Sequence, residues 1–215
     1  MMMPTLVQLN EFQSKGILRI KNAVPKELLT SAQKHIDSEL QRLGIKKYGS
    51  VPAQLKDIHF FQQITKLGQM INHDASLDRL ISDELVDFSE KLANSKLESP
   101  STTQLLISLP SKKEWSADHL NWHVDVNASP NGPVPGVQIF VLIREVKIHG
   151  GATMAKIGSH LLSKNSFEKR DIPIIEMYGE AGDVFLMDMR IVHSPSINAT
   201  REIRMMLTKR YMRMT

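Results

Sequence analysis

The segment WHVD at residues 122–125 carries the side chains whose types and spacing are best suited to chemistry. Side chains two positions apart on a strand point to the same face, so His123 and Asp125 can present an imidazole nitrogen and a carboxylate oxygen to one point. A further histidine, His193, follows 70 residues after His123, directly after an apolar stretch expected to form a strand. Two histidines and one carboxylate that leave other coordination positions open form the facial triad of non-haem iron(II) sites. The sequence therefore predicts a metal site made of His123, Asp125 and His193.

An arginine close behind this triad suggests a second component of the site. Arg204 lies eleven residues after His193, on a segment expected to form a strand. The period of a strand places its side chain on the face shared with Met206 and Thr208. A guanidinium that points into a barrel stays charged and requires an anion. A dicarboxylic co-substrate that chelates the metal at one end would place its other carboxylate there, in a charge-assisted pair.

These residues belong to a longer series of motifs that resembles the phytanoyl-CoA dioxygenase family of iron(II)/2-oxoglutarate oxygenases. The series consists of WHVD at 122–125, GGAT at 150–153, GSH at 158–160, GDVF at 182–185, and then His193, Asn198 and Arg204. Order and spacing agree throughout residues 104–211. The opening FQSKGIL at 12–18 is also similar to the family's N-terminus, so the resemblance covers most of the chain.

The resemblance implies a mainly β fold, a double-stranded β-helix (jelly roll, cupin-like) core with N-terminal helices packed on one sheet. By motif position, His123, Asp125 and His193 would be the catalytic metal ligands and would bind Fe(II). Arg204 would hold the distal carboxylate of 2-oxoglutarate, with O2 as the second co-substrate.

One departure from the family pattern concerns the remaining contacts to 2-oxoglutarate. Family members often carry a serine two residues after the distal histidine, where this chain has Pro195. Ser196 or Thr208 could replace that contact. Gln104, nineteen residues before His123, could reach the carboxylate nearer the metal.

The activity implied by the resemblance is a dioxygenase that hydroxylates, desaturates or cyclises a small molecule at an unactivated C–H bond, with release of succinate and CO2. A secondary metabolite or an amino-acid-like compound is the expected substrate. Related halogenases have a small residue where this chain has Asp125, so the carboxylate favours hydroxylation, desaturation or ring closure. The alternative is a non-catalytic jelly-roll protein that binds metal for structure or sensing. Arg204 distinguishes the two, because a structural metal site does not need a carboxylate clamp beside it.

The elements that must position these residues fall into two halves. The second half has six short apolar segments with the pattern of strands, at 103–109, 136–146, 151–157, 172–178, 183–189 and 203–212. Such strands without intervening helices favour an antiparallel sandwich or barrel. Within 137–143 the odd positions are all β-branched, which predicts a strand with one face packed on a core.

The first half is predicted to be mostly helical. Apolar residues recur at helical spacing in 25–43, 58–70 and 76–92. A short strand is expected at 16–20 and a loop at 94–103. We expect a single domain over 1–215, with a mostly helical flank at 1–100 and the jelly-roll core at 101–215.

Composition limits the remaining possibilities. The chain has 215 residues, 41% of them hydrophobic and 23% charged, which is typical of a globular protein. It has no cysteine, which excludes disulfides, thiolate metal sites and cysteine nucleophiles. The net charge is +4, but the basic residues are dispersed, so no nucleic-acid partner is expected.

The sequence also bears on location and partners. No apolar run approaches the roughly 20 residues needed to cross a bilayer, and the first ten residues do not have the pattern of a secretory signal. We therefore expect a cytoplasmic protein without a membrane partner. A small-molecule substrate and a monomeric or homodimeric state complete the prediction.

Overall fold

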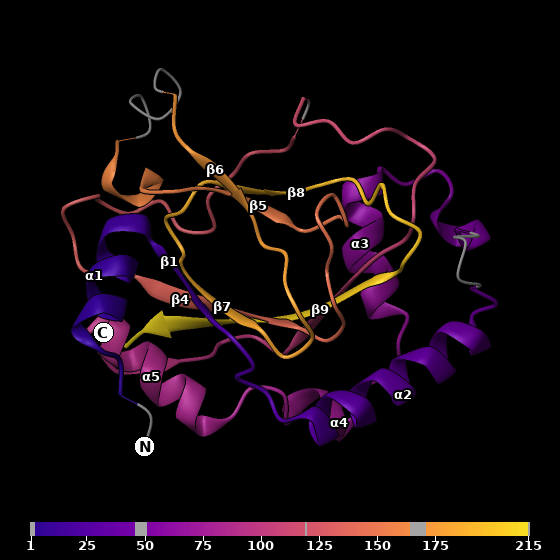
Figure 1. Cartoon of the computed structure of the whole chain (residues 1–215), viewed down its shortest axis with the longest axis horizontal. Coiled ribbons are helices and arrows are strands. Elements are labelled where there is room, and N and C mark those ends of the chain that lie inside the picture. The colour runs from indigo at the N-terminus through magenta and orange to yellow at the C-terminus, as the bar shows by residue number, and fades with distance from the viewer. Residues whose placement is uncertain (1–2, 46–50, 119, 164–170, 215) are drawn as a thin grey trace.

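Two antiparallel sheets face each other, and helices cover the outer side of the larger sheet (Figure 1). The computed structural model describes residues 3–45, 51–118, 120–163 and 171–214. The strands are β1 (Ile17–Ile20), β2 (Leu97–Glu98), β3 (Gln104–Ser108), β4 (Gly136–Leu142), β5 (Thr153–Lys156), β6 (Ile174–Glu176), β7 (Val184–Asp188), β8 (His193–Pro195) and β9 (Arg204–Arg213). The larger sheet has the order β1-β7-β4-β9-β2 with β3 also paired to β9, and the smaller sheet has the order β6-β5-β8. The mainly β core with flanking helices is confirmed.

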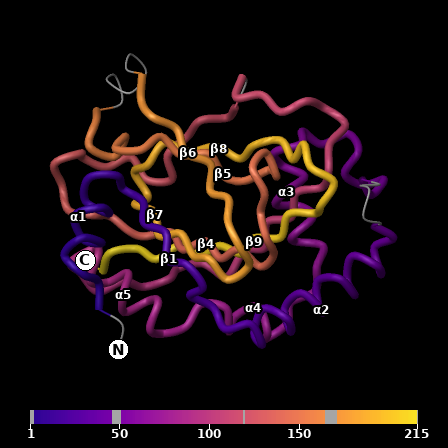
Figure 2. Tube along the Cα trace, in the orientation of Figure 1, coloured from indigo at the N-terminus to yellow at the C-terminus, as the bar shows by residue number. Residues whose placement is uncertain are grey.

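The helices come almost entirely from the first half of the chain. They are α1 (Leu6–Lys15), α2 (Lys26–Arg42), α3 (Phe60–Gln69), α4 (Ala75–Asp78) and α5 (Asp83–Ala93), with 3-10 turns η1 (Ala53–Leu55) and η2 (Ser159–Leu161). Figure 2 shows α1 at one end of the strands, α3 at the other end, and α2, α4 and α5 below them. No helix in the described part of the chain is both long and apolar enough to span a membrane.

The strand β4 lies in the middle of the larger sheet and is buried along its whole length. Val137, Ile139 and Val141 pack in the hydrophobic cluster that the helices share, whereas Phe140 and Leu142 pack in the cluster between the sheets. The prediction that only one face would be packed was therefore wrong. Alternating β-branched residues are equally compatible with a strand that is covered on both sides.

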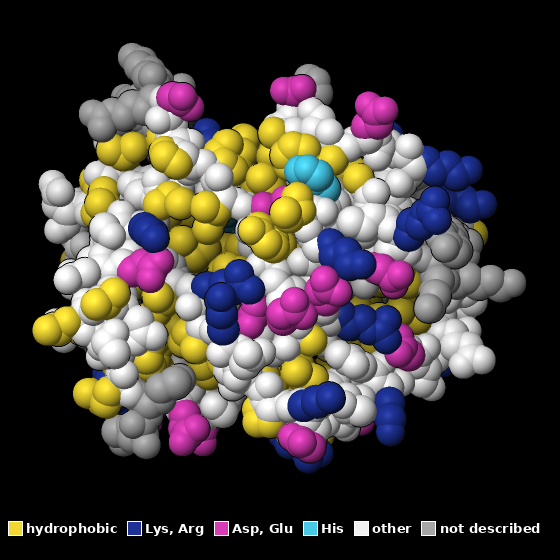
Figure 3. Space-filling view, in the orientation of Figure 1, with side chains coloured by type: hydrophobic (Ala, Val, Ile, Leu, Met, Phe, Trp, Pro, Cys, Tyr) yellow, Lys and Arg dark blue, Asp and Glu magenta, His cyan; other side chains and the backbone are white. Residues whose placement is uncertain are grey.

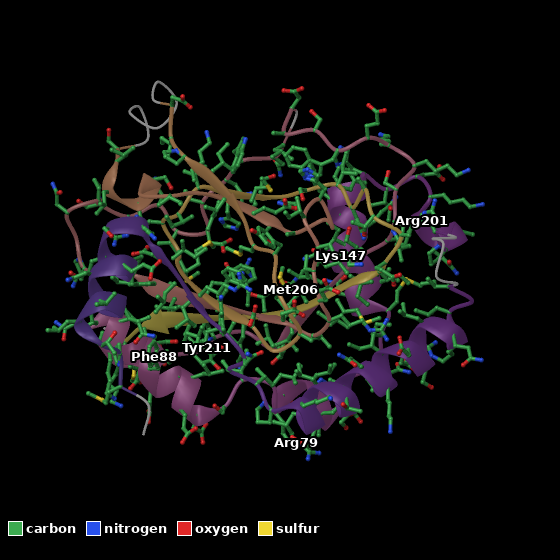
Figure 4. The ribbon with its side chains drawn as sticks, viewed as in Figure 1. Arg79, Phe88, Lys147, Arg201, Met206 and Tyr211 are labelled. Atoms are coloured by element: carbon green, nitrogen blue, oxygen red, sulfur yellow. The ribbon has the colours of Figure 1, made fainter. Side chains whose placement is uncertain are left out.

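The strand β9 shows the same division between the two sides of the larger sheet. Met206 lies between the sheets, and Tyr211 lies on the helix side near Phe88 of α5 (Figure 4). The sequence predicted a loop at 94–103, but this segment contains β2, which pairs with the end of β9. A two-residue strand has too few residues for its pattern to be recognised in the sequence.

Helix ends explain two further differences from the prediction. The expected helix at 76–92 is divided into α4 and α5, because the Ser82 hydroxyl accepts a hydrogen bond from the Leu85 amide and starts a new helix. Helix α1 was not predicted. It begins at a capping box between Thr5 and Gln8 and ends at Gly16, which has φ 72°. An added Cβ at Gly16 would lie 2.5 Å from His160 Nδ1, so this turn requires glycine.

A glycine also determines how closely α3 approaches the larger sheet. A Cβ added at Gly68 would lie 1.8 Å from the Leu105 carbonyl oxygen of β3, so the helix rests directly on the strand backbone. We expect Gly68→Ala to push α3 away from β3 and to lower the free energy of unfolding by about 1–3 kcal/mol. Chemical denaturation measures this loss, with the exposed neighbour Gln69→Ala as the control, expected to stay within about 0.5 kcal/mol of the wild type. An equally stable Gly68→Ala protein would show that the helix is free to shift.

Candidate metal centre

His123 and His193 come from distant parts of the chain and lie directly opposite each other in an antiparallel backbone bridge. The His123 amide donates to the His193 carbonyl at 3.0 Å, and the His193 amide donates to the His123 carbonyl at 2.9 Å. The two imidazole ring centroids are 4.3 Å apart. The backbone pairing that starts β8 thus places both side chains on the same side of the bridge.

A backbone carbonyl fixes the orientation of each imidazole. Nδ1 of His123 lies 2.8 Å from the Asn121 carbonyl oxygen, and Nδ1 of His193 lies 3.0 Å from the Ile191 carbonyl oxygen. Because a carbonyl oxygen only accepts hydrogen bonds, each Nδ1 carries a proton, and Nε2 is the nitrogen left to bind a metal. Burial lowers the pKa of His193, which also favours the neutral ring. This is the usual outer-shell arrangement of metal-binding histidines.

Asp125 completes a set of three potential ligands. One donor atom from each of His123, Asp125 and His193 lies within 4.8 Å of the other two, and Asp125 Oδ2 is 3.8 Å from His193 Nε2. Two imidazole nitrogens and one carboxylate oxygen on one side match the facial triad that binds iron(II) and leaves other positions open. The structure thus brings together the three residues predicted from the sequence.

Asp125 also contacts an arginine that sequence analysis missed. Arg210 of β9 donates from Nε to Asp125 Oδ2 at 3.1 Å and from Nη2 to Oδ1 at 3.2 Å. The period of β9 puts Arg204, Thr208 and Arg210 on one face. Extending the alternation by one more step would have found Arg210.

Arg204 is a buried cation without an anionic partner in the described part of the chain. Its side chain is 3% exposed, its Nε has no hydrogen-bond acceptor there, and Nη1 lies 3.7 Å from the Met206 sulfur. Burial lowers the pKa of this guanidinium to about 10. A buried charge of this kind is costly unless a ligand pairs with it. The residues present therefore fit an anionic group bound beside the metal ligands.

A cavity of about 480 Å³ connects these groups. It is lined by both histidines and Arg204, together with α3 and the inner faces of β3 and β4. A second cavity of about 460 Å³ adjoins it and shares Gln69, Gln104, Thr208 and Arg210 of its lining. The volume of the larger cavity alone allows a small organic molecule to lie next to the metal ligands.

The three additional contact residues suggested by the sequence have different surroundings. Gln104 and Thr208 line the larger cavity, opposite each other on β3 and β9. Ser196 does not belong to the lining of this cavity among the described residues, and its hydroxyl donates to the Ala152 carbonyl at 2.8 Å.

Gln138 of β4 is a further lining residue that sequence analysis missed. It is 2% exposed, its Nε2 donates to the Thr208 hydroxyl at 3.0 Å, and its Oε1 has no hydrogen-bond donor in the described part of the chain. A single polar residue within an otherwise apolar buried strand is unusual. That interruption was the available signal in the sequence.

Comparison with solved structures places this fold among known ones. The carbocyclase SnoK from nogalamycin biosynthesis, described as non-heme and alpha-ketoglutarate dependent, is 18% identical with a TM-score of 0.69 over 98% of this chain and 84% of its own. AviO1 from Streptomyces viridochromogenes Tue57 is 17% identical with a TM-score of 0.70 over 99% and 96%. EctD from S. alaskensis, solved with 2-oxoglutarate and 5-hydroxyectoine, is 19% identical with a TM-score of 0.68 over 98% and 76%.

Sequence comparisons give a family but no individual relative. The search of curated proteins finds no significant match. The pattern of the family described as phytanoyl-CoA dioxygenase (PhyH) matches residues 12–206, which include all three potential metal ligands and Arg204. This chain belongs to the phytanoyl-CoA dioxygenase (PhyH) family.

Proposed function

We propose that this chain is an iron(II)- and 2-oxoglutarate-dependent dioxygenase that oxidises an unactivated C–H bond of a small molecule and releases succinate and CO2. The observation that carries the proposal is Arg204, a buried and unpaired guanidinium in the cavity that His123 and His193 also line. The distal carboxylate of 2-oxoglutarate would supply its missing partner. A metal site with a purely structural or sensing role leaves this buried charge unexplained.

The residues of the site have separate roles in the proposed function. His123, Asp125 and His193 would hold iron(II) on one side, which leaves the cavity side open for 2-oxoglutarate and dioxygen. Bound iron with 2-oxoglutarate and dioxygen supplies the oxidising chemistry. The proteins of similar fold include a carbocyclase, so a ring closure is as compatible with this fold as a hydroxylation.

The hydrogen-bond donors still available on Thr208 and Gln138 indicate which of them makes the second contact to 2-oxoglutarate. The Thr208 hydroxyl already donates to the Ile139 carbonyl at 2.9 Å, so it has no proton left for a carboxylate. Gln138 has a second N–H on the amide nitrogen that Thr208 holds in place. We infer that Gln138 donates to the co-substrate and that Thr208 positions it.

This inference predicts different results for two buried polar residues. Gln138→Leu is expected to raise the 2-oxoglutarate concentration needed for half-saturation by about tenfold, the usual effect of losing one hydrogen bond to a charged group. Ser196→Ala is expected to leave it unchanged, because Ser196 bonds to the Ala152 carbonyl outside the cavity lining. Titration of each iron-loaded variant with 2-oxoglutarate measures both. A reversed order would assign the contact to Ser196.

The proposed function is tested by product analysis. The iron-loaded protein is incubated with 2-oxoglutarate, oxygen and a panel of small organic molecules, and succinate is quantified. At least one compound is expected to accelerate succinate formation by tenfold or more and to be converted with one succinate per product. A gain of one oxygen atom in the product identifies hydroxylation, and a loss of two hydrogen atoms identifies desaturation or ring closure. If no succinate forms above the level of an Asp125→Ala control, the proposal is wrong.

A further inference from the structure

The two neighbouring cavities have cations in their lining and no carboxylate among the described residues. The larger cavity has Lys66, Arg204 and Arg210 in its lining, and the adjoining one has Lys209 and Arg210. The surface is different, because acidic and basic side chains are interspersed on the face shown in Figure 3. The positive lining is therefore a local property of the cavities.

Arg210 is placed to bind a ligand other than the anion of Arg204. The two arginines are six residues apart on β9, which separates their backbones by about 20 Å at the rise of an extended strand. The distal carboxylate of one 2-oxoglutarate molecule cannot pair with both side chains. Arg210 lines both cavities, its side chain is 38% exposed, and its Nη1 has no partner in the described part of the chain.

The charges of the loaded site do not balance around Arg210. In the proposed function, the charges of the divalent ion, 2-oxoglutarate, Asp125 and Arg204 add up to zero, because the two positive groups carry as much charge as the three carboxylates. Asp125 would then give one of its oxygens to the metal, so Arg210 would lose part of the bidentate contact it now makes. Arg210 and Lys66 are left as cations that face the space for the substrate.

We propose that the substrate of this site is an organic carboxylate whose anionic group binds Arg210, with Lys66 adding to the positive field. This inference rests on the proposed function. The planar guanidinium suits a carboxylate because two parallel N–H groups match its two oxygens. The carboxylate would anchor the substrate at the Arg210 end of the cavity, and the remainder would lie toward the open side of the metal ligands.

The test compares acids with their uncharged amides on the loaded protein. The protein holds iron(II) and saturating 2-oxoglutarate without oxygen. The probes are octanoate and octanamide, 3-phenylpropionate and 3-phenylpropanamide, and N-acetyl-leucine and N-acetyl-leucinamide, each titrated to 10 mM by calorimetry. At least one acid is expected to bind about tenfold more tightly than its amide. If no acid binds more tightly than its amide, the inference is wrong.

Three variants identify the residue responsible. Arg210→Gln is expected to abolish the preference for the acid, and Lys66→Gln to reduce it. Arg144→Gln is the matched control, since Arg144 also pairs with an aspartate, Asp37, but lines neither cavity, and it is expected to keep the preference. An unchanged preference in an Arg210→Gln protein that still holds iron overturns the inference.

The visible absorption of the iron and 2-oxoglutarate chelate separates this inference from the proposed function. The band must persist when the acid binds, because its loss would mean that the acid displaces 2-oxoglutarate, and that result also overturns the inference. The same band shows whether Arg210→Gln still holds iron through Asp125; if it does not, Lys66→Gln decides alone. If the wild type shows the band but binds no acid more tightly than its amide, only this inference is wrong. If the wild type shows no band but prefers an acid over its amide in a way that depends on Arg210, only the proposed oxygenase function is wrong.

Discussion

His193→Ala is expected to lower the affinity for iron(II) by at least about 100-fold and to abolish turnover. Changes to residues that merely orient a metal ligand typically cost 10–100-fold in affinity, and His193 is itself one of three potential ligands whose donor atoms lie within 4.8 Å of one another. Anaerobic equilibrium dialysis against iron(II) measures the affinity, and succinate formation measures turnover.

The control for this variant is a histidine remote from the site. His35 is half-buried, its Nε2 lies 2.8 Å from the Asn72 carbonyl oxygen, and it lines neither cavity of the site, so His35→Ala is expected to bind iron like the wild type. Circular dichroism checks that both variants are folded. Iron binding by folded His193→Ala within threefold of the wild type would show that the metal ligands have been misassigned.

Arg204→Met is expected to make the protein more stable and to impair its use of 2-oxoglutarate. The lowering of the Arg204 pKa to about 10 by burial corresponds to a cost of roughly 3 kcal/mol for keeping the charge in the folded protein. Removing the charge should raise the free energy of unfolding of the unloaded protein by about 1–3 kcal/mol at pH 7. The gain should shrink as the pH rises past about 10, because the folded wild type then loses the charge. The concentration of 2-oxoglutarate needed for half-saturation should rise at least about 100-fold.

A second buried arginine provides the matched comparison. Arg190 bonds to Asp188 Oδ2 at 2.7 Å and to the Ser129 carbonyl at 2.9 Å, so its charge is paired within the chain. Arg190→Met is therefore expected to lose about 3–5 kcal/mol of stability, the opposite sign to Arg204→Met. Urea denaturation of the two variants measures both signs. Equal destabilisation would mean that Arg204 has an internal partner and has no need of a ligand.

The potential metal ligands could be predicted because they depend on strand geometry. His123 and Asp125 share a face through the period of two, and His193 follows a recognisable strand. The alternation along β9 and the polar interruption of β4 point to Arg210 and Gln138, but the contacts of these two residues could not be derived in the same way, because they depend on which segments are neighbours. Gln138 meets Thr208 only through the pairing of β4 with β9, and Arg210 meets Asp125 only after the loop before β4 has folded back.

The fold was predictable where the sequence pattern is long and periodic. The main strands and helix α2 fall close to their expected ranges. Helix α1 was missed because it buries only Phe12, so it has little apolar periodicity and is defined by its ends. The division between α4 and α5 depends on one capping serine, Ser82. The burial of both faces of β4 depends on what packs against it, which the alternation along one strand does not specify.

The central claim is that His123, Asp125 and His193 hold iron while Arg204 holds 2-oxoglutarate, and an anaerobic titration tests it most directly. The metal-free protein is titrated with iron(II) and then with 2-oxoglutarate, and the visible charge-transfer band of the chelate is recorded for the wild type and for Arg204→Met. The account predicts a band in the wild type that needs at least about 100-fold more 2-oxoglutarate in the variant. Iron binding without a band in the wild type, or a band that is equally easy to form in Arg204→Met, would contradict it.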